Sequence, residues 1–227
     1  MALEFLKIRR HSTGKVTYAN YANDQERAIA GNQRGEGIWV PSYQNAVEEG
    51  TVFTALVGAA TTPISFAKTA YDADQPQFVV DVPSGTTIRP LSLKVILEDA
   101  AGTDTEIIQS FANANMGAGT STAVTSADLL FNMRAQAAGT DPATACSVYS
   151  LYTGNGSLTS GMREFWRHTA QFAQEADDAD ANDGIWGILK GDIGPVIEGT
   201  GSWVVHIDGT TTAPAGFLIA TWWEYTT

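Results

Sequence analysis

From residue 37 onward, short runs of β-branched and aromatic residues alternate with clusters of Gly, Thr, Ser, Asp and Pro. This pattern is typical of an all-β domain, because the apolar runs have the length of strands and the small polar clusters favour turns. Strands are predicted at residues 38–43, 52–57, 64–68, 78–82, 88–97, 105–111, 129–135, 146–152, 185–189, 202–207 and 216–225.

Two of these regions show apolar residues at every second position, which places such residues on one face of a strand. The first set is Leu91, Leu93, Val95 and Leu97. The second region covers residues 202–207 and 216–225, which are separated by a run of Gly, Thr, Ala and Pro. Alternation on both sides of this run predicts a closing hairpin with a long turn.

Two segments carry helical signals. Residues 162–173 fit a helix or a strand about equally well, because their larger residues lie at helical spacing and Ser160 could cap a helix there. These residues are Met162, Phe165, Trp166, Thr169, Phe172 and Ala173. A short helical turn is predicted at residues 42–49, where Pro41 precedes and Gly50 follows.

The many short strands predict an all-β fold, a two-sheet β-sandwich of jelly-roll type, because a doubled sheet protects the edges of its strands. A chain of 227 residues is long enough for one such domain. We expect residues 37–227 to form the sandwich and residues 1–36 to form an extended N-terminal arm.

Charge separates the arm from the rest of the chain. The whole chain has 13 Lys+Arg and 25 Asp+Glu, a net charge of −12, which argues against nucleic acid or an anionic membrane as a partner. Residues 1–34 hold six basic and three acidic residues, a local charge of 6 − 3 = +3. Residues 35–227 hold the other seven basic and 22 acidic residues, a local charge of 7 − 22 = −15. We expect Lys7, Arg9, Arg10 and Lys15 to contact an acidic neighbour.

Neither an export signal nor a membrane span is expected. Charged residues lie where a secretory signal needs its apolar stretch, and the longest apolar runs fall short of the roughly 18 residues of a spanning helix. Cys146 is the only cysteine, so an intrachain disulfide is impossible, and we expect it to be buried as a small apolar residue. Synthesis in a cytoplasm is the expectation.

The chain has no recognisable catalytic pattern. The three histidines are His11, His168 and His206, and none accompanies a nucleophile motif of the Gly-x-Ser-x-Gly type. His206 is expected to be a half-exposed strand residue. The spacings typical of zinc sites are also missing. We therefore predict no catalytic residue, no cofactor and no enzymatic activity.

An acidic run offers the oxygen ligands that calcium prefers, and its members are Glu175, Asp177, Asp178, Asp180 and Asp183. An EF-hand loop that starts at Asp178 needs Gly at position 183 and Glu at position 189, but the chain has Asp183 and Leu189. A solvated loop is the preferred interpretation, and an irregular calcium site stays open. Chelation is then expected to leave the melting temperature nearly unchanged.

The tryptophans allow a binding function, because indole faces can stack on sugar rings. They are Trp39, Trp166, Trp186, Trp203, Trp222 and Trp223. Trp222 and Trp223 are adjacent and must point to opposite faces of a regular strand. At least one is therefore expected away from the core or at an interface. Packing in the core and between subunits is the preferred role, and sugar binding is the alternative.

Two stretches carry a resemblance to a known class. They are VVDVPSGT at 79–86 with its continuation to Leu97, and GSWVVH at 201–206 with GFLIATWWE at 216–224. Together with abundant Ala, Gly and Thr, they resemble small virion structural proteins of tailed bacteriophages, especially jelly-roll decoration or cement proteins of capsids.

The resemblance implies a non-enzymatic protein on the capsid exterior that bridges major capsid subunits. Aromatic content beyond the needs of one core predicts a homo-oligomer, a trimer, with Trp222 and Trp223 at or near the interface. A carbohydrate-binding module and a jelly-roll subunit that itself builds the shell are the alternatives.

Overall fold

The computed structural model describes residues 9–10, 30–31, 46–59, 62–66, 68–99, 104–126, 129–134, 142–154, 161–171, 185–187, 194–209 and 213–226. The chain divides into two compact units, residues 1–45 and residues 46–227. In the first unit, β1 (Arg9–Arg10) pairs in parallel with β2 (Ala30–Gly31). The strand predicted at 38–43 lies outside the described residues.

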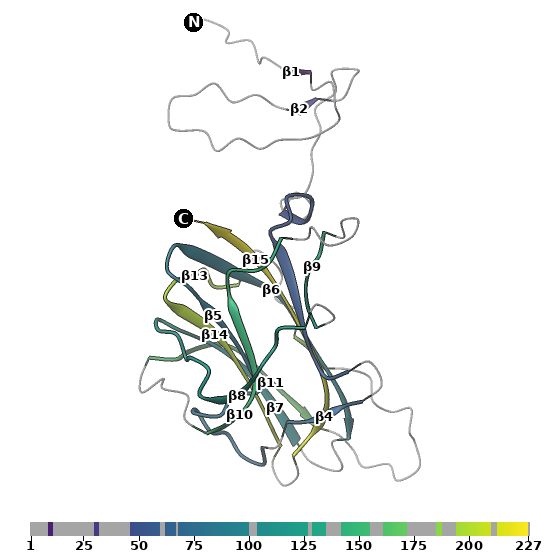
Figure 1. Ribbon diagram of the computed structural model, residues 1–227. Coiled ribbons are helices and arrows are strands. Elements are labelled where there is room, and N and C mark those ends of the chain that lie inside the picture. Colours follow the sequence, from purple (N-terminus) through teal and green to yellow (C-terminus); the bar gives the residue numbers. More distant parts are fainter. Residues whose placement is uncertain are drawn as a thin grey trace, which may run out of the picture. The chain divides into compact units, whose positions relative to one another are not determined.

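The second unit is a sandwich of two antiparallel sheets (Figure 1). One sheet has six strands in the order β11 (Arg163–Gln171), β7 (Asp104–Ala112), β14 (Gly201–Gly209), β5 (Phe78–Val82), β10 (Ser147–Gly154) and β8 (Thr120–Ala123). The other runs β12 (Ile185–Gly187), β6 (Thr86–Asp99), β15 (Ala215–Thr226), β3 (Val52–Val57) and β9 (Leu130–Asn132), and β13 (Ile197–Glu198) and β4 (Ile64–Ser65) bring it to seven strands.

The order of the strands is that of a jelly roll, so the predicted fold class is confirmed. Four strands of one sheet run β3-β15-β6-β12 and four of the other run β5-β14-β7-β11, and the chain repeatedly crosses between the sheets, as the double Greek key requires. Strands β8, β9 and β10 lie in sequence between β7 and β11. They extend both sheets at the edge away from β11 and β12.

Most predicted strands form where the alternation placed them. β3 and β5 have the predicted bounds, and the other predicted strands within the described residues differ only at their ends. The short strands β8 and β13 were not predicted, because Thr120–Ala123 and Ile197–Glu198 are too brief to alternate. Of the turn predicted at 42–49, residues 46–48 are helical, and Gly50 follows with φ +72°, the left-handed conformation expected after a helix end.

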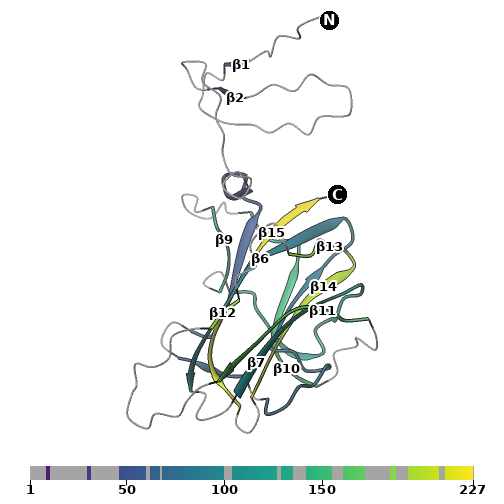
Figure 2. The ribbon, with the colours of Figure 1, turned by 180° about the vertical axis from the view of Figure 1, so that it is seen from behind.

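The segment with both helical and strand signals is a strand over Arg163–Gln171. It pairs with β7 from Arg163↔Phe111 to Gln171↔Asp104, and β11 and β7 lie side by side when viewed from behind (Figure 2). The register shifts between Glu164 and Trp166, so Phe165 and Trp166 both pack against the core although they are adjacent. This register shift lets a strand place two adjacent large residues on the core side, which a regular strand does not do.

The predicted closing hairpin is wrong, because its two strands belong to different sheets. β14 pairs with β5 and β7, whereas β15 pairs with β3 and β6. Alternation specifies which side chains of a strand face the core, but it does not specify the neighbouring strand.

The core lies between the inner faces of the two sheets. Trp203 of β14 and Trp222 of β15 are fully buried there, Trp203 edge-on to Phe78 and Trp222 stacked near Phe53. The predicted apolar set on β6 needs one correction. A register shift opposite Thr221 and Trp222 leaves Leu91 half-buried outside the core cluster, and Ile88 occupies the inward position instead.

Candidate functional site

The structure places the predicted interface residues in different environments. Trp222 lies inside the chain's own core, so its indole is not accessible to a partner. Trp223 is half-buried on the opposite face, where its ring lies 5.5 Å from that of Tyr225, and its interface role stays a prediction. Arg9 and Arg10 form β1, and Lys7 and Lys15 lie outside the described residues.

The histidines and the cysteine can be placed in part. Cys146 is buried, as predicted, and burial raises the pKa of its thiol, with a further rise from Glu224. His168 is exposed on β11 and stacks on Trp166. His206 is fully buried, so the expectation of a half-exposed side chain is wrong. His11 and the acidic run at 175–183 lie outside the described residues.

Within the described ranges, no group of three or more His, Cys, Asp or Glu side chains gathers as a metal site. None of the tryptophans whose burial is described has an exposed side chain, and Trp166 and Trp223 are the half-buried ones. No helix in the described part of the chain has the length and apolar character that a membrane crossing needs.

One segment that covers the outer face of the six-stranded sheet is held by Asp81 of β5. Its Oδ1 accepts hydrogen bonds from Met116 N at 2.9 Å and from Ser202 Oγ at 2.6 Å, and its Oδ2 accepts one from Gly117 N at 2.7 Å. The loop between β7 and β8 is thereby fixed over the sheet. Met116 then joins a second small core with Val79, Ala112, Tyr152 and Val204.

Residues 68–77 cover another part of the same face and explain why His206 is buried. The Tyr71 ring lies 4.8 Å from the imidazole of His206, and His206 Nε2 lies 3.4 Å from the carbonyl oxygen of Ala73. Gln77 Oε1 accepts a hydrogen bond from Ile207 N, and Lys68 O accepts one from Gly209 N at 3.1 Å. Burial lowers the pKa of His206 to about 4.

A pocket of about 250 Å³ opens beside this segment and is lined by Thr69, Ala70, Tyr71, Glu106, Asp208 and Gly209. Asp208 is only 4% exposed, and neither of its carboxylate oxygens has a hydrogen-bond partner among the described residues. Burial and, to a smaller extent, the charge of Glu106 raise the pKa of Asp208 to about 6, although Lys68 acts in the opposite direction. We call this cavity the Asp208 pocket.

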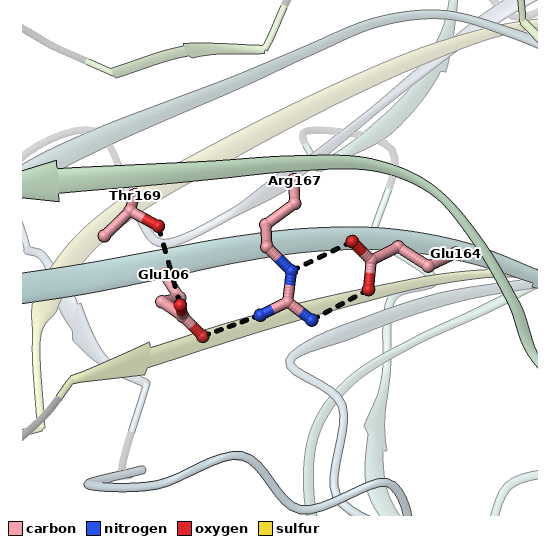
Figure 3. A network of polar contacts seen from close by, with 4 residues as sticks. All are labelled: Glu106, Glu164, Arg167 and Thr169. Carbon is pink, nitrogen blue, oxygen red and sulfur yellow. Dashed lines mark hydrogen bonds and ion pairs between the residues drawn. The ribbon is translucent and has the colours of Figure 1, made fainter.

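A polar network holds the rim of the Asp208 pocket (Figure 3). Arg167 of β11 donates to Glu106 Oε2 at 3.0 Å and, through two nitrogens, to Glu164 at 2.8 and 2.9 Å. Thr169 Oγ1 lies 3.5 Å from Glu106 Oε1. Arg167 therefore orients the Glu106 carboxylate, whereas the Asp208 carboxylate accepts no hydrogen bond from the described residues.

The outer face of the seven-stranded sheet carries a larger and apolar pocket of about 650 Å³. We call it the apolar-face pocket, and its lining is Leu56, Val57, Gly58, Ala59, Ile96, Ser126, Leu129, Phe217, Leu218 and Ile219. Alternation along β15 explains its chemistry, because Leu218 and Ala220 are buried in the core while Phe217 and Ile219 are half-buried on the outer side.

Comparisons of the chain with protein-family models, with curated proteins and with solved structures found no match.

Proposed function

We propose that the protein is a non-enzymatic structural protein of a virion, a capsid decoration or cement protein that self-associates and bridges neighbouring major capsid subunits. The jelly-roll order of the strands supports this proposal, because jelly rolls recur in viral capsid and lectin domains. A fold alone does not specify a function. The surface must therefore supply the decisive observation.

That observation is the apolar-face pocket. Residues 68–77 and the loop at 113–119, which belong to the chain itself, cover parts of the outer face of the other sheet. On the seven-stranded sheet, Leu56, Ile96, Phe217 and Ile219 line an open apolar hollow. Covering apolar surface with a partner stabilises a complex by roughly 25 cal/mol per Å² of buried area. Exposed apolar patches therefore commonly mark interfaces. An apolar sheet face of this kind suits a structural contact.

The proposed mechanism is mechanical. A protein that binds the assembled shell and not its separate subunits stabilises the shell by mass action. Bridging needs one contact with the shell and one with another copy, and a closed symmetric oligomer offers both repeatedly. We therefore propose a trimer on the capsid exterior, with the major capsid protein as its partner.

The test is binding of the purified protein to particles of its own virus that lack it. We expect saturable binding at a fixed ratio and a higher temperature of shell rupture. Ile219→Asn, in the apolar-face pocket, is expected to raise the dissociation constant by about tenfold. Val196→Asn is the matched control, because Val196 is exposed and does not line the pocket. Circular dichroism melting verifies that both variants fold.

Three outcomes would count against the proposal. The first is the absence of saturable binding to particles by the wild-type protein. The second is binding to oligosaccharides in place of particles, which would favour a carbohydrate-binding module. The third is assembly of the protein alone into closed shells, which would favour a capsid subunit.

A further inference from the structure

Asp208 is a buried acidic side chain on the outer face of the six-stranded sheet. Its side chain lines a pocket, and both carboxylate oxygens lack a hydrogen-bond donor among the described residues. Taking an ionised carboxylate out of water is costly unless an opposite charge or several hydrogen bonds compensate it. A group that supplies positive charge and N–H donors at this point would remove that cost.

The walls of the Asp208 pocket fit a cation. Glu106, which Arg167 neutralises in part, adds a second carboxylate at the rim, and the half-exposed Tyr71 adds an aromatic ring that can lie against a cationic group. The volume, about 250 Å³, is below the roughly 300 to 1,000 Å³ of pockets for drug-sized ligands. The pocket therefore suits one cationic group and not a large molecule.

A metal ion fits this chemistry less well. Calcium takes six to eight oxygen ligands, usually with several carboxylates. The Asp208 pocket offers two carboxylates, and Glu106 already accepts a hydrogen bond from Arg167. No larger cluster of acidic or histidine side chains is found in the described ranges. An ammonium or guanidinium group, with several N–H donors on one charge, matches better.

We propose that the Asp208 pocket binds one ammonium or guanidinium group, and that this group is a basic side chain from residues 7–15 of a second copy of the chain. Lys7, Arg9, Arg10 and Lys15 place four of the chain's 13 basic residues within nine positions. The local charge of residues 1–34 is 6 − 3 = +3 and that of the remaining residues is 7 − 22 = −15. Attraction between opposite charges favours such an encounter, and added salt weakens this attraction.

This inference rests on the self-association contained in the proposed function, and it names the contact that produces part of it. A tethered basic segment acts at a high effective concentration once its copy is held nearby. One weak contact per copy can therefore contribute measurably to the stability of a closed oligomer.

Sedimentation velocity of the full chain over a range of protein concentrations tests the proposal. Four proteins are compared: the wild type, Asp208→Asn, a basic-segment variant with Lys7→Gln, Arg9→Gln, Arg10→Gln and Lys15→Gln, and the combination of both. We expect each change to raise the dissociation constant of self-association by about tenfold or more. Because both remove the same contact, the combination should lose no more than either change alone.

Glu198→Gln is the matched control, because Glu198 is exposed and its loss changes the net charge by the same amount. It is expected to associate like the wild type. A synthetic peptide of residues 1–20 is the second probe. It should bind the basic-segment variant, whose own segment no longer competes, and should bind the combined variant at least about tenfold more weakly. Melting curves check that every variant is folded.

The proposal is overturned if Asp208→Asn associates like the wild type, if the two losses add, or if the wild type is a monomer throughout. These results are separable from the test of the proposed function. Association through the pocket without binding to particles rejects the virion role alone. Saturable binding to particles by a monomer rejects this contact alone.

Discussion

His206 and Asp208 lie two positions apart on β14 and point to the same face of the sheet, yet burial shifts their pKa values in opposite directions. The pKa of His206 falls to about 4 and that of Asp208 rises to about 6. In both cases desolvation disfavours the charged form. Near neutral pH, His206 is therefore uncharged, whereas Asp208 is largely ionised and accepts no hydrogen bond from the described residues.

These shifts predict opposite effects of pH on stability. The contribution of His206 is complete above 6.5, its ordinary pKa, and is lost as the pH falls through about 4. The contribution of Asp208 is complete below its ordinary pKa of 3.8 and is lost as the pH rises through about 6. Between about pH 4 and pH 6, acidification therefore lowers the contribution of His206 to stability and raises that of Asp208.

We therefore expect Asp208→Asn to lose stability on acidification more steeply than the wild type, and His206→Gln to lose it less steeply. The measurement is the free energy of urea unfolding from roughly pH 7 to pH 4. Parallel curves for the wild type and both variants would contradict the assigned shifts.

At the scale of elements, the loop over the six-stranded sheet depends on a side chain from below it. Asp81 accepts hydrogen bonds from Met116 N, Gly117 N and Ser202 Oγ. Asp81→Ala removes the acceptor of Gly117 N, whereas Met116 N keeps Ser202 Oγ and Ser202 Oγ keeps Ala114 O, so we expect a loss of about 1 to 3 kcal/mol in the free energy of unfolding. Asp74→Ala, in an exposed turn, is the control and should change it by less than about 0.5 kcal/mol. Equal losses would show that Asp81 does not fix the loop.

The network at the edge strand β11 is expected to contribute little to stability despite its four hydrogen bonds. The side chain of Arg167 is 43% exposed, and both of its carboxylate partners are also accessible to water. Exposed ion pairs contribute about 0 to 1 kcal/mol, so Arg167→Ala should lower the free energy of unfolding by no more than that. Thermal or urea unfolding at low and high salt measures it. A larger loss that persists at high salt would mean that the pair is effectively buried.

At the scale of the whole molecule, the chain divides into two units, and their sequences have opposite charge. A tethering role for the first unit predicts that residues 1–34 can be removed without loss of the jelly roll. We expect the shortened protein to keep a largely intact melting transition but to be retained less well on particles, and the difference should shrink with added salt. Collapse of the melting transition, with no separate binding defect, would instead indicate an edge strand of the chain's own sheet.

The candidate site was not predicted from the sequence. Nothing in the sequence distinguished Asp208 from other acidic residues. The polar residues His206 and Asp208 do alternate along β14 with Val205 and Ile207, which are buried in the core. That pattern indicates a polar outer face. It does not show that residues 68–77 cover this face and remove the carboxylate from water.

The class of fold and the position of most strands could be predicted from the sequence, because alternation and turn residues act over a few neighbouring positions. Contacts between distant segments specify which strands pair, that β14 and β15 belong to opposite sheets, and that residues 163–171 form a strand beside β7. The tertiary structure also decided the chemistry of Asp208, whose environment comes from β7 and from residues 69–71, far away in the chain. Pairing and desolvation depend on contacts between distant segments, and a local pattern does not specify such contacts.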